Sequence, residues 1–233
     1  MQLIELKKRL KNLKDKGFIP SKRKGPTGIG YTFETELNLN ETNIAIPDLG
    51  GRIELKTMRK ASKSLVTLFT FNKAVWQIHP KKAMKKYGYF DENGRRCLYV
   101  TVAFGTPNKQ GLLLDIDKSK ANLRLRDKAG FLIGNWRISH IVAKFLSKMA
   151  RVIVVFADTR KNKLGNEEFF YKNAYLLENP SDTNFVRAIK NKSAFVDIRM
   201  YLRPDGSVRN HGTGFRVYEK DLNLLYQARK ELI

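Results

Sequence analysis

Apolar side chains recur along this chain with two different periods, which predicts a fold that mixes helices and strands. Leu3, Leu6, Leu10 and Leu13 are spaced as on one face of a helix. Gly17 follows at the position of a C-terminal cap, so a helix is expected over residues 2–16. Further helices are expected over residues 31–37, 74–87, 138–149, 182–191 and from about Glu219 onward.

Strands are expected where β-branched, aromatic and leucine residues alternate with polar residues or form short runs. These segments are RIELKTM, SLVTLFTF, LYVTVAF, GLLLDID, NLRLRD, RVIVVFAD, EFFYKNAYLL and AFVDIRMYL. The sequence contains neither an internal repeat nor a low-complexity linker. It therefore predicts an α/β protein with a mixed sheet flanked by helices and an additional β-rich lobe.

Charge narrows the class of partner. The 233 residues include 45 Lys and Arg against 22 Asp and Glu, a net charge of +23 spread over the whole chain. Such an excess attracts polyanions, and nucleic acid is the polyanion favoured here because lysine and arginine neutralise phosphates. On charge alone, a general basic protein such as a ribosomal protein is as good an interpretation as a DNA enzyme.

Cysteine content and hydropathy indicate the compartment. The single Cys97 cannot form an internal disulfide, and no Cys/His cluster has the spacing of zinc ligands. No apolar run approaches the roughly 20 residues that a membrane span requires, and the N-terminus is amphipathic instead of signal-like. We therefore expect a soluble, cytoplasmic protein without a membrane partner.

The segment IPDLGGRIELKTMRK carries the candidate chemistry: Asp48, Glu54 and Lys56. On a strand, Glu54 and Lys56 point to one face while Leu55 points to the other. Asp48 lies in the turn before this strand, where Pro47 restrains the backbone. Two carboxylates brought together in this way would bind Mg²⁺, and a lysine beside them could position a nucleophile on a phosphodiester or stabilise the developing charge.

Taken alone, this short pattern is more typical of a solvated strand face than of a nuclease. The preceding loop, PSKRKGPTGIG, changes the balance because it combines glycines with many hydrogen-bond donors. Glu34, just after the loop, adds another acid. The residues expected to contact DNA phosphates are Lys22, Arg23, Lys24, Thr27 and Lys63.

The segments KRKGPTGIGYTFE, IPDLGGRIELKT and KSLVTLFT, in this order, resemble the MvaI/BcnI family of Type II restriction endonucleases, whose active site is related to that of the nickase MutH. VDIR and HGTGFR resemble the MvaI side of the family. The resemblance implies a PD-(D/E)xK nuclease with a catalytic lobe, approximately residues 1–90, and the remaining sheet and DNA-recognition lobe, approximately 91–233. It further implies Mg²⁺ dependence, a monomer, cleavage of one strand at a time and a CC-N-GG type target, with CCWGG favoured.

By motif position, the resemblance makes Asp48, Glu54 and Lys56 the catalytic trio, Asp48 and Glu54 the metal ligands, and Glu34 a supporting acid. The expected partners are double-stranded DNA and a companion DNA methyltransferase.

Base recognition is expected from the C-terminal segments. Asp197 and Arg199 share a strand face, and such a pair suits a G·C base pair because an acid accepts from cytosine N4 and arginine donates to guanine O6 and N7. An exposed ion pair within the strand is the alternative for these two residues. His211 and Arg216 are expected beside them on a turn and strand. Arg209 stands where the family pattern has a second histidine, so part of the target is left open.

Three functions fit the sequence: a Type II restriction endonuclease, a MutH-like repair nickase that needs an activating partner, and a non-catalytic basic DNA-binding protein. We expect the first.

Overall fold

The computed structural model describes residues 3–39, 53–60, 64–71 and 75–233. The chain divides into two compact units, each built from separated segments. Unit 1 comprises residues 1–64, 147–181 and 222–233, and unit 2 comprises residues 65–146 and 182–221. Assignment of a catalytic role to one unit and a recognition role to the other stays a prediction.

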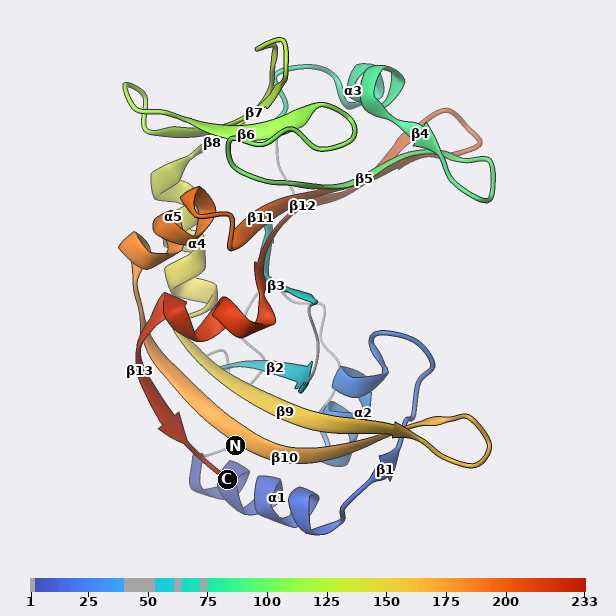
Figure 1. The fold of residues 1–233 in the computed structure, drawn as a ribbon, viewed down its shortest axis with the longest axis vertical. Helices are drawn as coiled ribbons and strands as arrows, with labels where there is room; N and C mark the ends of the chain where they lie inside the picture. Colours follow the sequence, from blue (N-terminus) through green and yellow to red (C-terminus); the bar gives the residue numbers. More distant parts are fainter. Residues whose placement is uncertain (1–2, 40–52, 61–63, 72–74) are drawn as a thin grey trace. The chain divides into compact units, whose positions relative to one another are not determined.

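Unit 1 contains a five-stranded sheet in the order β1–β10–β9–β2, with β13 pairing with β10 as well (Figure 1). β2 and β9 are parallel, whereas the other neighbours are antiparallel. The strands are β1 (Ile19–Pro20), β2 (Glu54–Arg59), β9 (Arg151–Lys161), β10 (Glu167–Pro180) and β13 (Tyr226–Glu231), and the helices are α1 (Leu3–Asp15) and α2 (Gly28–Glu36).

The core of unit 1 follows from the hydrophobic pattern. α1 buries Leu6, Leu10 and Leu13 among the apolar side chains of α2, β9 and β10. Tyr171 of β10 is fully buried, and its hydroxyl donates to the carbonyl oxygen of Ile29 at 2.8 Å. This bond ties α2 to the sheet and satisfies a polar atom that would otherwise cost free energy.

Unit 2 contains two antiparallel sheets, β3–β12–β11–β5–β4 and β6–β7–β8. The first consists of β3 (Leu65–Phe71), β4 (Tyr89–Phe90), β5 (Arg96–Val102), β11 (Ala194–Leu202) and β12 (Val208–Tyr218). The second consists of β6 (Leu112–Asp117), β7 (Asn122–Asp127) and β8 (Leu132–Arg137). The helices are α3 (Pro80–Tyr87), α4 (Ile138–Lys148) and α5 (Asp182–Lys190); α4 ends in unit 1, and the 3₁₀ helix η1 (Glu219–Leu225) likewise crosses the boundary.

An aromatic cluster packs one face of the larger sheet of unit 2. Phe69 of β3 stacks on Phe215 of β12 at 4.9 Å between ring centroids, and Phe145 of α4 stacks on Phe185 of α5 at 4.5 Å. Phe69 and Phe185 lie 5.9 Å apart, which joins the two pairs. The same face carries the buried Thr213, whose hydroxyl oxygen accepts from Trp136 Nε1, whereas Asp197 and Arg216 lie on the other face.

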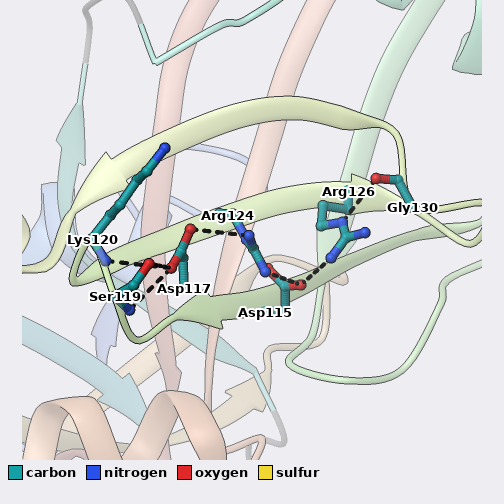
Figure 2. Close-up of polar contacts among 7 residues, drawn as sticks. All are labelled: Asp115, Asp117, Ser119, Lys120, Arg124, Arg126 and Gly130. Atoms are coloured by element: carbon teal, nitrogen blue, oxygen red, sulfur yellow. Dashed lines mark hydrogen bonds and ion pairs between the residues drawn. The ribbon is translucent and has the colours of Figure 1, made fainter.

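A polar ladder runs along β6 and β7 of the smaller sheet (Figure 2). Arg124 donates to both oxygens of Asp115 at 2.7 and 2.9 Å, and Arg126 donates to Asp115 at 2.8 Å. Burial alone would raise the pKa of Asp115, but these two arginines lower it. Arg124 also reaches Asp117. The charges of this sheet are therefore largely compensated within the sheet.

The mixed α/β expectation is confirmed, with differences at some elements. The helix expected from about Glu219 is present only as the 3₁₀ helix η1, which ends at Leu225; β13 follows and pairs with the edge of β10. The helix expected over residues 74–87 begins at Pro80, where the His79 side chain accepts from the Lys81 amide and so caps it. Among the described residues, no helix is long and apolar enough to span a membrane.

Candidate active site

Glu54 and Lys56 lie on one face of β2, as their spacing predicts. The Glu54 residue is only 3 % exposed, and its Oε1 accepts a hydrogen bond from Lys56 Nζ at 2.5 Å. Leu55, which points to the opposite face, belongs to the hydrophobic core of unit 1. The alternation of side chains along the strand thus places an acid and a lysine on one face, while Leu55 packs into the core on the other.

A second lysine completes the surroundings of Glu54. Lys148 Nζ lies 2.7 Å from Glu54 Oε2, and the two side chains are 16 % and 5 % exposed. Their contact has the distance of an ion pair without the angular geometry of a hydrogen bond. The sequence analysis did not identify Lys148, because no local motif joins it to β2.

Lys148 reaches Glu54 because β2 and β9 are parallel. Their register pairs Glu54 with Val152. α4 ends at Lys148, only four positions before Val152, so the turn into β9 brings the lysine to the start of β2. The signal that could have identified this residue is a parallel pairing of RIELKT with RVIVVF.

Tyr226 of β13 forms a hydrogen bond to the same turn. This residue is 7 % exposed, and its hydroxyl donates to the carbonyl oxygen of Met149 at 3.0 Å. Burial raises the pKa of Tyr226, and the nearby charge of Glu54 raises it further. The tyrosine therefore stays a neutral donor and holds the residue that follows Lys148.

Two of the expected catalytic or phosphate-binding residues, Asp48 and Lys63, lie outside the described residues. Glu34 is half-buried on α2, which packs against β2 so closely that a Cβ at Gly30 would lie 3.4 Å from Thr57 Oγ1. Within the described part of the chain, no three carboxylate, imidazole or thiol side chains come together as metal ligands. Glu54 offers a buried hard oxygen of the type that Mg²⁺ binds, and Mg²⁺ needs few protein carboxylates.

The basic glycine loop is folded back on itself before α2. The hydroxyl of Ser21 donates to the carbonyl oxygen of Arg23 at 2.7 Å, and a Cβ at Gly28 would lie 2.4 Å from that same oxygen. Only glycine fits such a close approach. Lys24 and Thr27 are exposed, and the side chain of Thr27 makes no capping bond to α2.

The other two basic residues of this loop already have partners. Lys22 Nζ lies 2.6 Å from Glu36 Oε1, and Lys16 Nζ lies 2.8 Å from the other oxygen of Glu36. Hydrogen bonds from Lys16 and Lys22 lower the pKa of Glu36. The guanidinium of Arg23 lies over the Tyr31 ring at 3.7 Å. Of the four expected phosphate contacts in this loop, Lys24 and Thr27 are thus the more accessible.

In unit 2, the expected base-reading residues lie on the polar face of the larger sheet. Asp197 of β11 pairs with Thr101 of β5 on one side and with Gly214 of β12 on the other. Asp197 Oδ1 accepts from the Thr101 hydroxyl at 2.7 Å, and Arg216 Nη1 donates to Oδ2 at 2.6 Å. Arg216 is itself held by the carbonyl oxygen of Leu65.

Arg199 does not pair with Asp197, so the alternative of an exposed ion pair within the strand is wrong. Asp197 is 7 % exposed, and Arg199 Nη2 donates to Thr70 Oγ1 of β3 at 3.0 Å. The pairing of β11 with β12 shifts at this residue, and Gly214 leaves room for the guanidinium: a Cβ there would lie 3.4 Å from Arg199 Nη2.

His211 and Arg209 are exposed on β12, which begins at Val208, so His211 lies in a strand and not in the expected turn. The His211 ring centroid is 6.0 Å from that of Tyr201. Partial burial lowers the pKa of His211, and the positive charges of Arg209 and Arg199 lower it further. The imidazole is therefore neutral near pH 7, with one donor and one acceptor nitrogen.

Comparison with known proteins matches the chain to one family and to solved structures of one restriction endonuclease. The sequence pattern of the MvaI/BcnI restriction endonuclease family matches residues 7–226. The chain is similar to restriction endonuclease MvaI in complex with its cognate DNA substrate, with 29 % identity, a TM-score of 0.81 and 100 % of both chains covered. It is also similar to MvaI in the absence of DNA, with 28 % identity, a TM-score of 0.56, and 100 % of this chain and 98 % of that chain covered. No curated protein matches the sequence.

Proposed function

From the premise that the chain belongs to the MvaI/BcnI restriction endonuclease family, and is thus a Type II site-specific endonuclease, we propose that it is a Mg²⁺-dependent, PD-(D/E)xK enzyme that hydrolyses duplex DNA. It acts as a monomer, one strand at a time, at a CC-N-GG type site, with CCWGG favoured. The observation that carries the proposal is the buried Glu54 carboxylate, which lies beside Lys56 in a strongly basic chain.

In this proposal Glu54 holds the metal together with Asp48, and Glu34 supports them. When bound, Mg²⁺ polarises the scissile phosphate and lowers the pKa of a bound water. Lys56 Nζ, already beside Glu54, orients the attacking water and stabilises the negative charge that develops on the phosphate oxygens. Water then forms the new P–O bond as the bond to the leaving sugar oxygen breaks.

The polar face of the larger sheet in unit 2 suits base recognition. A carboxylate oxygen has more than one lone pair, so Asp197 can accept from cytosine N4 while it retains Arg216 and Thr101. Arg199 Nη2 donates to Thr70 and to the carbonyl oxygen of His211, which leaves the N–H groups of Nη1 for guanine. Arg209, His211 and Arg216 complete the proposed set of base-reading residues.

Double-stranded DNA is the proposed partner, because the similar MvaI structure is a complex with its cognate DNA substrate. Lys24 and Thr27 contact phosphates, with Lys22, Arg23 and Lys63 supporting them. The enzyme works in the cytoplasm, and a companion DNA methyltransferase protects the host sequence.

Digestion of a sequenced plasmid tests the proposal. Wild type is incubated with Mg²⁺ and with EDTA, and Asp48→Ala is incubated with Mg²⁺. Discrete fragments that require both Mg²⁺ and Asp48, with ends mapping to CCWGG, are the expected result. Nicked circles as the sole end product favour a partner-dependent nickase, and absence of any cleavage contradicts the proposed reaction.

A further inference from the structure

The surroundings of Glu54 contain more positive charge than the proposed catalytic trio accounts for. Lys56 and Lys148 lie 2.5 and 2.7 Å from its two carboxylate oxygens. One carboxylate thus has an ammonium group beside each of its two oxygens. A lysine ammonium group is strongly hydrated, so its burial costs free energy. A second lysine at the same carboxylate therefore calls for an explanation.

The position of Lys148 is fixed by three separate elements. It ends α4, a location that the helix dipole favours for a cation. It precedes β9, whose parallel register sets it beside Glu54. The next residue, Met149, is fully buried and is bonded through its carbonyl oxygen to Tyr226. The ammonium group is therefore directed toward Glu54 by the backbone.

We propose that Lys148 is a positioning residue of the nuclease centre: it holds Glu54 Oε2 while Lys56 holds Oε1, and so fixes the orientation of the carboxylate that would bind the metal. This inference rests on the proposed function, since it assigns Glu54 to the metal. Lys148 has two consequences. It fixes the rotation of the carboxylate, and its positive charge weakens metal binding at that carboxylate.

The two consequences predict that one substitution strengthens metal binding and slows cleavage. Lys148→Met removes a cation that competes with Mg²⁺, so metal binding to the DNA-free protein becomes about 3- to 10-fold tighter. It also frees the carboxylate to rotate, so single-turnover cleavage at saturating Mg²⁺ falls about 10- to 100-fold. DNA affinity in Ca²⁺ stays within about threefold of wild type, because the substitution leaves the proposed DNA contacts in place.

Calorimetric titration with Mg²⁺, single-turnover cleavage and DNA binding in Ca²⁺ measure the three quantities. Lys60→Met is the matched control: Lys60 follows β2 directly, is 61 % exposed and approaches Asp158 only to 3.9 Å. It should leave the Mg²⁺ affinity and the cleavage rate unchanged. Lys148→Arg keeps the charge with a different geometry, so its Mg²⁺ affinity should resemble that of wild type while cleavage stays slow; it also serves if Lys148→Met does not fold.

A purely structural role for Lys148 predicts a lower melting temperature with unchanged Mg²⁺ affinity and cleavage rate in the folded variant, and that result overturns the inference. Failure of the proposed function can be distinguished from failure of this inference. If wild type binds Mg²⁺ but cuts no DNA, tighter binding by Lys148→Met still supports the placement of Lys148. If wild type binds no Mg²⁺ and Glu54→Gln changes nothing, both proposals fail.

Discussion

Glu54 in unit 1 and Asp197 in unit 2 are both buried carboxylates with two neighbouring donors, but the donors differ in kind. Glu54 contacts two lysines, whose ammonium groups end flexible chains. Asp197 contacts a threonine hydroxyl and an arginine that is itself held by a backbone carbonyl. Under the function proposed above, a flexible lysine can make room for a metal ion at Glu54, whereas the fixed donors around Asp197 hold that carboxylate in one orientation for base recognition.

Removal of the Glu54 charge should give the largest effect. Glu54→Gln is expected to lower the cleavage rate by at least about 100-fold, because a neutral amide is a weaker Mg²⁺ ligand than a carboxylate and attracts the Lys56 ammonium group less strongly. DNA affinity in Ca²⁺ should change little. Single-turnover digestion and filter binding measure the two quantities. Cleavage at the wild-type rate contradicts a catalytic role for this carboxylate.

Asp197→Asn should separate recognition from chemistry. The amide cannot reproduce the ion pair with Arg216, and it presents donors where the carboxylate accepts. We expect weaker discrimination between target and single-mismatch duplexes, by about 1–3 kcal/mol, at the base pair that Asp197 contacts. Competition binding with a set of duplexes measures this. Equal loss of affinity for all duplexes, specific and random, would show that Asp197 merely supports the sheet.

Asp127 is a third buried carboxylate, and its hydrogen-bond partners all belong to unit 2. It ends β7 and accepts from the Phe131 amide, Lys86 and Tyr87. Burial alone would raise its pKa, but these hydrogen bonds lower it to about 2. Because the folded pKa lies below the unfolded one, the stabilisation is present above about pH 4 and is lost as the pH falls toward 2.

Asp127→Asn should therefore lower the free energy of unfolding by about 2 kcal/mol at pH 7, the typical contribution of a charged hydrogen bond. The difference from wild type should shrink between pH 4 and pH 2. Urea unfolding at several pH values measures it. If the difference in unfolding free energy between variant and wild type stays constant over this range, the charge of Asp127 does not contribute to stability.

The smallest effect is expected in the polar ladder of β6–β7–β8. Arg124 is engaged with Asp115 and Asp117 (Figure 2), so Arg124→Gln should change DNA affinity less than twofold and leave its salt dependence unaltered. Lys24→Gln, at an exposed residue of the glycine loop, should reduce the salt slope by about 0.9 if Lys24 contacts one phosphate. Titrations at several salt concentrations compare the two variants.

Contacts between residues close in sequence could be predicted, and contacts set by topology could not. The shared face of Glu54 and Lys56 follows from strand alternation alone. Lys148 and Tyr226 join Glu54 through a parallel register and an edge strand that no local pattern encodes. Similarly, the common face of Asp197 and Arg199 could be predicted, whereas the partner of each depends on the register of β11 with β12.

The error at the end of the chain has a physical cause. Residues 226–231 contain Ala, Arg, Lys and Glu, which favour helices when local propensity decides. They form β13 because the edge of β10 offers unpaired backbone groups, and this tertiary pairing overrides propensity. Charged side chains on an edge strand also discourage pairing with a further chain.

The interleaving of the two units has a consequence for synthesis of the protein. Residues 226–231 emerge from the ribosome after both segments of unit 2, yet they supply β13 and the tyrosine that fastens the turn beside Glu54. Contacts between residues so distant in sequence form late in folding. An incompletely synthesised chain therefore carries the proposed nuclease centre without its final support, and we expect the assembly of an active endonuclease to wait until this strand has joined the sheet.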